Sequence, residues 1–422
     1  MKTVRLDERL FRTEAENGVT VLSELLPGVR SVAVGIWVTT ASVHEKRPKM
    51  GVSHLLEHMV FKGTDRRSAR DIALELEVRG GALDAYTSRD HTSYQARVLD
   101  EDLPRALDVL TDLVRNPTLR EGDLDLERKV VLEEISSVED TPDDVVFELH
   151  ARTLWPEHPY GYSILGTRET VSCLEADDLR ELHGRAYNPR HIVIAAAGNL
   201  NHDLLLKLLA KCGWFTFDAG PELEAVDSVP PAARTISKVP RDTAQMHVVL
   251  GTDTFPYRDQ RRYPLILLTT VLGSGMSSTL FQRVREELGL AYSVHTYQSF
   301  YRETGVAGVY VGSHPSAADQ AVAVICEELA KLSIEGLTAQ RLAEAKQQLK
   351  GQVTLSLESP SARMYRLATI ALYGEPYRTI DQLLAEIDRV SADQVAQVGH
   401  EFLDPDRQTI VWLGPTDSHQ LT

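Results

Sequence analysis

The two halves of this 422-residue chain look like distant copies of each other, which limits the folds available to it. A segment starting at Gly80, G-G-A-L-D-A-Y-T-S-R-D-H-T-S-Y-Q-A-R-V, is echoed by one starting at Gly289, G-L-A-Y-S-V-H-T-Y-Q-S-F-Y-R-E-T-G-V-A-G-V-Y-V. Between the halves, residues 218–234 combine acids, Gly and a Pro-Pro pair that break all periodicity. We therefore predict a duplicated unit, with one domain in residues 1–217, a linker in 218–234 and a homologous domain in 235–422.

Strands and helices are mixed within each half. Segments at 19–24, 31–39, 85–99 and 192–197 are rich in β-branched residues or alternate polar with apolar side chains, which predicts strands. Helical patterns fill most of the intervals. With 43% hydrophobic residues, the chain can form two cores of about 200 residues or fewer each. The predicted fold class is α+β.

Residues 51–63, G-V-S-H-L-L-E-H-M-V-F-K-G, contain the pattern H-x-x-E-H. On a helix with about 100° per residue, His54, Glu57 and His58 share one face, and an apolar stripe occupies the other. Phe61 lies on the face of the histidines. Two imidazoles four residues apart can bind one Zn²⁺, and a carboxylate between them can deprotonate a bound water. The pattern indicates a zinc site with Glu57 as general base. The plainer alternative is a pair of solvated or buried histidines beside a surface glutamate.

A catalytic zinc needs three protein ligands and one open position, so a third ligand must come from elsewhere. The best candidates lie in the helical run 124–138, where Glu127 and Glu134 are two turns apart on one face. A glutamate in an acidic helix is most often solvated, so these residues alone leave both interpretations open. In the second half, the segment corresponding to the motif is 263–272, Y-P-L-I-L-L-T-T-V-L, which offers no ligands. Only the first half is expected to hold the metal.

Taken together, these motifs resemble the pitrilysin-type zinc peptidases, most closely the branch of the mitochondrial processing peptidase β subunit and its bacterial relatives. Further matching segments are E-R-K-V-V-L-E-E-I at 127–135, H-P-Y-G-Y-S-I-L-G-T at 158–167 and Y-N-P-R-H-I-V-I-A-A-A-G-N at 187–199. The resemblance covers nearly the whole chain. It implies that Glu134 is the third ligand and that Glu127 orients a ligand. It also implies two similar domains that face each other as a clamshell, each a mainly antiparallel sheet of about six strands with helices packed on it.

The resemblance assigns two residues of the second half to the active site. Arg285 and Tyr292, in F-Q-R-V-R-E-E-L-G-L-A-Y-S-V, have the spacing at which the family supplies an Arg and a Tyr across the cleft. A tyrosine hydroxyl can donate to the oxyanion of a tetrahedral intermediate, and an arginine can anchor a substrate carbonyl. Without the resemblance, Arg285 is equally well a solvated helix residue and Tyr292 a strand aromatic.

Substrate contacts are also implied by the resemblance. The strand D-A-Y-T-S, which begins with Asp84 and Ala85, matches an edge strand that an extended peptide joins by backbone hydrogen bonds. The family usually has Asn where this chain has Asp84, which when ionised only accepts hydrogen bonds. Asp144 and Glu148 match two acids that bind an arginine just upstream of the cut, and Phe61 matches an aromatic wall for the residue after it. A solvated acidic helix face remains the alternative for the two acids.

The overall composition restricts the partners. A formal net charge of −16 disfavours nucleic acid and anionic membranes, because phosphate binding needs a basic surface. Apolar runs end well short of a membrane span, and the N-terminal residues lack the apolar core of a signal peptide. An odd number of cysteines, three, favours thiols in a reducing compartment. We expect a cytoplasmic protein without membrane spans.

The sequence thus predicts a zinc metalloendopeptidase with one Zn²⁺ per chain. Its expected substrates are extended or unfolded peptides, including presequence-like peptides with Arg near the cut, taken into a closed chamber. By resemblance, a second copy of the chain or a homologous subunit is the expected protein partner. The alternative is a non-catalytic structural or assembly subunit of the same fold, and the retained ligands and base favour the enzyme.

Overall fold

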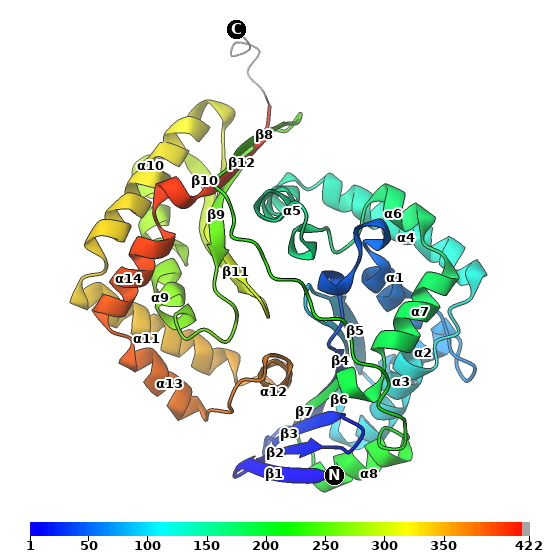
Figure 1. Cartoon of the computed structure of the whole chain (residues 1–422). Helices are drawn as coiled ribbons and strands as arrows, with labels where there is room; N and C mark the ends of the chain where they lie inside the picture. Colours follow the sequence, from blue (N-terminus) through cyan, green and yellow to red (C-terminus); the bar gives the residue numbers. More distant parts are fainter. Residues whose placement is uncertain (416–422) are drawn as a thin grey trace. The chain divides into compact units, whose positions relative to one another are not determined.

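The computed structural model describes residues 1–415, which form two compact units (Figure 1). Unit 1 consists of Met1–Ile135, Tyr162–Val226 and Leu355–Thr379. Unit 2 consists of Ser136–Gly161, Asp227–Thr354 and the described residues from Ile380 onward. The change of unit after Val226 falls inside the predicted linker, 218–234. The predicted linear domains, 1–217 and 235–422, stay a prediction, and residues 416–422 of the second lie outside the described part.

Unit 1 is built on a seven-stranded sheet with the order β1-β2-β3-β7-β4-β6-β5. All neighbouring strands are antiparallel except β3 and β7, which are parallel. Strand β5 forms one edge of this sheet. The strands are β1 (Lys2–Asp7), β2 (Leu10–Glu14), β3 (Thr20–Leu25), β4 (Ser31–Val38), β5 (Ala82–Thr87), β6 (Thr92–Leu99) and β7 (Ile192–Gly198).

Unit 2 repeats this topology with five strands in the order β10-β11-β9-β12-β8. Five neighbouring strands of unit 1, β5-β6-β4-β7-β3, are connected along the chain in the same way as these five. Each set has one parallel pair, which is β7 and β3 in unit 1 and β12 and β8 in unit 2. The strands are β8 (Ile236–Pro240), β9 (Met246–Thr254), β10 (Ala291–Phe300), β11 (Gly305–Ser313) and β12 (Thr409–Gly414). The predicted α+β duplication is therefore confirmed, with seven and five strands in place of about six. The clamshell arrangement stays a prediction.

Helices cover both faces of each sheet. In unit 1 they are α1 (Val52–Val60), α2 (Ala69–Glu77), α3 (Leu103–Arg115), α4 (Glu121–Glu139, whose last turn enters unit 2), α6 (Arg168–Cys173), α7 (Ala176–Ala186), α8 (His202–Lys211) and α12 (Pro360–Tyr373). In unit 2 they are α5 (Pro142–Leu154), α9 (Arg262–Gly273), the π-helix η6 (Phe281–Glu287), α10 (Pro315–Glu335), α11 (Ala339–Ser356, whose end enters unit 1), α13 (Ile380–Arg389) and α14 (Ala392–Phe402). Short 3₁₀ turns are η1 (Ser42–His44), η2 (Arg47–Lys49), η3 (Asp100–Asp102), η4 (Pro159–Gly161), η5 (Pro189–His191) and η7 (Pro405–Arg407).

Two helices are exchanged between the halves of the sequence. Side chains along a strand alternate between the two faces of a sheet. Ile36 of β4 lies in the core with α1 and α3. The next residue, Trp37, faces the other way, and its ring centroid lies 6.0 Å from that of Tyr365 on α12. Helix α12, from the second half, thus covers one face of the first sheet. Helix α5, from the first half, packs on β9 and β12 of the second sheet through Val146.

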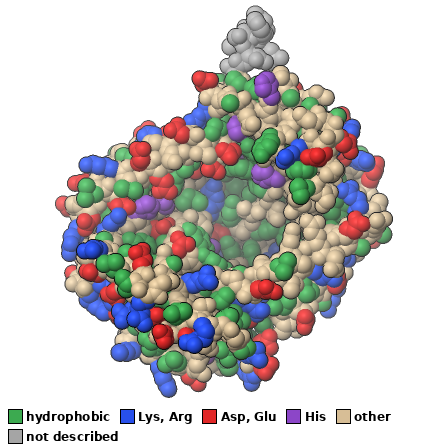
Figure 2. Space-filling model, turned by 180° about the vertical axis from the view of Figure 1, so that it is seen from behind, with side chains coloured by type: hydrophobic (Ala, Val, Ile, Leu, Met, Phe, Trp, Pro, Cys, Tyr) green, Lys and Arg blue, Asp and Glu red, His purple; other side chains and the backbone are tan. Residues whose placement is uncertain are grey.

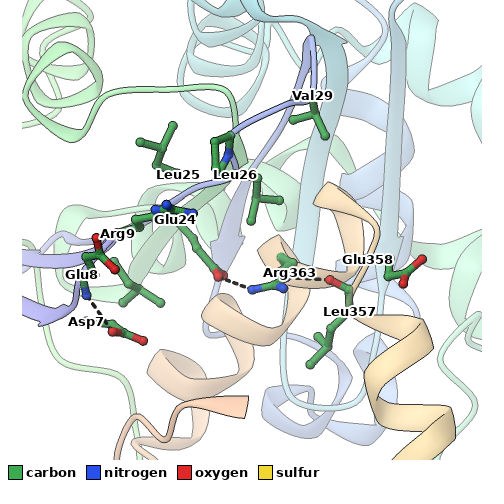
Figure 3. A pocket seen from close by; sticks show the side chains of 12 residues that line it. Asp7, Glu8, Arg9, Glu24, Leu25, Leu26, Val29, Leu357, Glu358 and Arg363 are labelled. Carbon is green, nitrogen blue, oxygen red and sulfur yellow. Dashed lines mark hydrogen bonds and ion pairs between the residues drawn. The ribbon is translucent and has the colours of Figure 1, made fainter. Parts of the chain in front are cut away.

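An ion pair fastens α12 to unit 1. Arg363 of α12 contacts the carboxylate of Glu24 on β3, and its Nε donates to the carbonyl of Leu357 at 2.6 Å (Figure 3). The Glu24 side chain is only 10% exposed. These residues line a cavity of about 540 Å³ between the β1–β2 turn, β3 and the start of α12.

Two sequence interpretations change in the structure. The single strand predicted at 85–99 is a hairpin, because residues 88–91, Ser-Arg-Asp-His, form a tight turn between β5 and β6. The β1–β2 hairpin was not predicted, since its first strand is largely exposed and rich in charge. Acidic and basic side chains are interspersed on the face seen in Figure 2. Among residues 1–415, none of the helices is long and apolar enough to cross a membrane.

Candidate metal centre

Helix α1 presents the two histidines of the motif. Leu55, Leu56 and Met59 are buried in the core of unit 1, which leaves His54 and His58 on the remaining face, with ring centroids 4.6 Å apart. The helix is therefore packed on one side and carries the polar groups on the other.

Helix α4 brings a carboxylate to the same place. Glu134 Oε2 lies 3.7 Å from His54 Nε2 and 3.5 Å from His58 Nε2. One ligand atom from each of these residues lies within 4.8 Å of the other two. Two imidazole nitrogens and one carboxylate oxygen are the donor set of a catalytic zinc with one open position. Burial and the neighbouring His58 lower the pKa of His54 to about 3, so its imidazole is neutral, as a ligand must be.

Glu127 contacts one of the candidate ligands, His58. It is buried, and its Oε1 lies 2.9 Å from His58 Nδ1. Donation from Nδ1–H to this carboxylate leaves the lone pair on Nε2, which is the nitrogen nearest Glu134. Lys62, one turn beyond His58, contacts the second oxygen of Glu127.

Glu57 lies between the histidines on α1 and is 8% exposed. Burial raises its pKa, and a hydrogen bond from Thr87 Oγ1 to Oε2, 2.6 Å long, offsets part of that rise. A carboxylate with a raised pKa, held in one orientation and beside three converging donors, is suited to accept a proton.

The residues implied as substrate contacts in unit 1 lie on and near β5. Asp84 is exposed, and its two oxygens accept hydrogen bonds from the Ala85 amide and from Gln95 Nε2. Ala85 is half-buried on the edge strand. The ring of Phe61 packs 6.3 Å from that of Tyr94 at the margin of the core.

The other predicted site residues belong to unit 2. Arg285 donates to the carbonyl of Tyr292 at 3.1 Å and lies over its ring, and Tyr292 is 75% exposed. Asp144 is exposed on α5, with Glu148 one turn further along. The roles of these four residues stay predictions.

Thr87 and Lys62 have contacts in this centre that sequence reasoning did not assign. For Thr87 the available signal was the alternation of side chains along β5. Thr87 lies on the same face of the strand as Leu83 and Ala85, which pack against the core below α1. For Lys62 the signal was its spacing of four residues from His58, which places it on the histidine face.

The duplicated α+β fold carries a cluster of His54, His58 and Glu134 that could hold a metal ion, and metal ions with such ligands serve metal-dependent hydrolases. Residues 20–168 match the insulinase family, peptidase family M16, and residues 174–349 match the domain described as peptidase M16 inactive domain. The chain belongs to peptidase family M16.

Relatives span almost the full chain. An uncharacterized zinc protease of Streptomyces coelicolor is 38% identical over 97% of this chain and 90% of its own length. The uncharacterized zinc protease YmxG of Bacillus subtilis is 39% identical over 94% of this chain and 96% of its own. Among solved structures, a peptidase M16 inactive domain from Pseudomonas fluorescens superposes with a TM-score of 0.90 at 19% identity, covering 97% of this chain and 99% of its own, which shows the shared fold.

Proposed function

We propose that this chain is a zinc metalloendopeptidase that cleaves extended or unfolded peptides. The observation that carries the proposal is the convergence of His54, His58 and Glu134 beside the buried carboxylate of Glu57. A relative that had lost catalysis would be free to lose the base or a ligand, and this chain keeps all four. The relatives named zinc proteases support the same activity.

Each residue has a distinct task in the proposed reaction. Zn²⁺ held by His54, His58 and Glu134 would act as a Lewis acid toward a water and the scissile carbonyl. Glu57 accepts the proton of the attacking water and passes it to the leaving amine. Thr87 holds the second oxygen of Glu57, so the other oxygen stays directed to the reacting atoms.

The substrate is proposed to bind as an additional strand. Among the strands of residues 1–415, β5 pairs only with β6, so its other edge offers backbone groups to an extended peptide. Arg285 and Tyr292 are proposed to stabilise the oxyanion of the tetrahedral intermediate. A preference for extended chains follows, because most backbone N–H and C=O groups of a folded protein are already paired within it.

The first prediction tests the base separately from the metal. Glu57→Gln is expected to lower kcat on a quenched peptide by about 10³-fold, while the bound zinc measured by elemental analysis stays at the wild-type level. Glu134→Gln is expected to lose zinc, because a ligand is removed. Glu133→Gln, the exposed neighbour on α4, is the matched control and should retain both. Wild-type turnover by the Glu57 variant would show that another group is the base.

A further inference from the structure

The first turn of α1 is capped from outside the helix. Its N-cap residue is Gly51, with φ +87°, and a Cβ at that position would lie 2.5 Å from the carbonyl oxygen of Leu165. Any residue with a side chain is therefore disfavoured there, so the helix cannot supply the usual Ser, Thr, Asp or Asn cap. The free amides of the first turn need another acceptor.

Glu45 supplies that acceptor. Its Oε2 accepts from the Gly51 amide and its Oε1 from the Ser53 amide, both at 2.8 Å, and the residue is 6% exposed. A carboxylate at a helix N-terminus also interacts favourably with the helix dipole. The side chain thus substitutes for the cap that Gly51 cannot provide.

The two zinc-binding histidines depend on this cap to different degrees. His58, in the last turn of α1, is held through its ring by Glu127. His54 is the third residue of the helix, and among the described residues its buried Nδ1 has no hydrogen-bond partner. Its position therefore depends on the backbone of the first turn, which is the part that Glu45 holds.

The segment that carries Glu45 also forms hydrogen bonds with residues that follow Thr87, the residue that donates to Glu57. Val43 N donates to the carbonyl of Arg89 at 2.9 Å, and Ser42 Oγ donates to that of Ser88. Ser88 directly follows Thr87, which holds Glu57. The loop at 42–45 thus connects the start of α1 to the end of β5 within unit 1.

We propose that Glu45 is a positioning residue of the metal centre: by accepting from Gly51 and Ser53 it fixes the first turn of α1 and so the place of His54 among the ligands. This inference rests on the metal site proposed above. Glu45 contacts no ligand side chain in the described contacts, so its effect on zinc passes through the backbone.

The test is the zinc affinity of the folded protein, measured by competition with a chromophoric chelator. Glu45→Gln keeps the size of the side chain but turns an amide NH₂ toward one of the two N–H donors, so the zinc affinity is expected to fall by about 10-fold or more. Glu45→Asp keeps both acceptors on a shorter arm and is expected to lie between wild type and Gln.

Ser68→Ala is the matched control. Ser68 caps α2, which has nine residues like α1, by accepting from the Asp71 amide. Its loss should lower thermal stability by a comparable amount without changing zinc affinity. If wild type binds no zinc, the metal site itself is wrong. If the wild type binds zinc and both Glu45 variants bind it as tightly as the wild type, Glu45 has no positioning role. The same follows if Ser68→Ala lowers the zinc affinity as much as the Glu45 variants do.

Discussion

His150 is a buried titratable group of unit 2, whereas the candidate metal ligands belong to unit 1. It lies on α5 and is 2% exposed, with Nε2 3.3 Å from the Thr409 carbonyl and Nδ1 3.2 Å from the Tyr297 hydroxyl. Burial lowers its pKa to about 4. The folded state therefore holds the neutral imidazole, and the unfolded state takes up a proton first as the pH falls.

This residue is expected to make unit 2 sensitive to acid. The stability contributed by the neutral ring is complete above about pH 6.5 and is lost as the pH falls toward 4. Between pH 7 and 4.5, the free energy of unfolding of the metal-free wild type, measured with urea, should fall by about 2–3 kcal/mol more than that of His150→Gln. Glutamine does not titrate in this range. The exposed His400→Gln is the control and should keep the wild-type response. An identical acid response in wild type and His150→Gln would contradict the prediction.

At the scale of elements, α12 is held by the pair of Arg363 and Glu24. Only one oxygen of Glu24 is paired with Arg363, and among the described residues its other oxygen is buried without a partner. Removing the arginine leaves a buried carboxylate uncompensated, which is more costly than removing both groups.

We predict a strong coupling between these two side chains. Arg363→Met should lower the free energy of unfolding by roughly 3 kcal/mol, and adding Glu24→Gln should restore most of it. Urea unfolding of the four proteins of the double-mutant cycle measures the coupling. If Arg363→Met is equally costly with Glu and with Gln at position 24, α12 is held by its apolar face alone.

The acids of α5 give a prediction about substrate choice. If Asp144 and Glu148 bind a guanidinium in a planar, bidentate way, Arg upstream of the cut should be preferred over Lys. The measurement is kcat/KM for matched Arg, Lys and Ala peptides on wild type and on Asp144→Asn/Glu148→Gln. If the wild type cleaves the three peptides equally, the two acids are a solvated helix face and do not select the substrate. The same conclusion follows if the double variant keeps the preference for Arg.

At the scale of the whole molecule, the exchange of α5 and α12 makes each half of the sequence depend on the other. Residues 1–226 contain the whole metal cluster but not α12, so Trp37 and the strand face around it lose their cover. An uncovered apolar sheet face favours aggregation.

Separate expression of the fragments tests this dependence. Fragment 1–226 alone should aggregate or bind a hydrophobic dye. Its fusion to residues 355–379 should bind zinc and less of the dye, and the remaining dye is expected at α5, whose apolar face lacks the second sheet in both proteins. The fusion is still expected to lack peptidase activity, because Arg285 and Tyr292 are absent from it. A soluble, dye-negative fragment 1–226 would show that α12 is dispensable for unit 1.

Local spacing determined what could be predicted from the sequence. The positions of His54, Glu57 and His58 on one helix face follow from a period of 3.6 residues, and the strands of β3, β4 and β7 follow from their composition. Glu134 could be selected over other acids through the family resemblance, and the structure places it beside both histidines. The turn at 88–91 was missed because it carries no Gly or Pro to interrupt the strand pattern.

The tertiary structure decided the contacts between residues far apart in the chain. Thr87 donates to Glu57, which is thirty residues earlier in the chain. Helix α12 covers the first sheet, although more than a hundred and fifty residues separate it from β7, the strand of that sheet nearest to it in the sequence. Glu45 caps α1 only because Gly51 is packed against Leu165, a proximity that the fold creates. Periodicity tells which face of a helix or strand is apolar, but it does not tell which partner will cover that face, since any apolar surface of suitable shape removes it from water equally well.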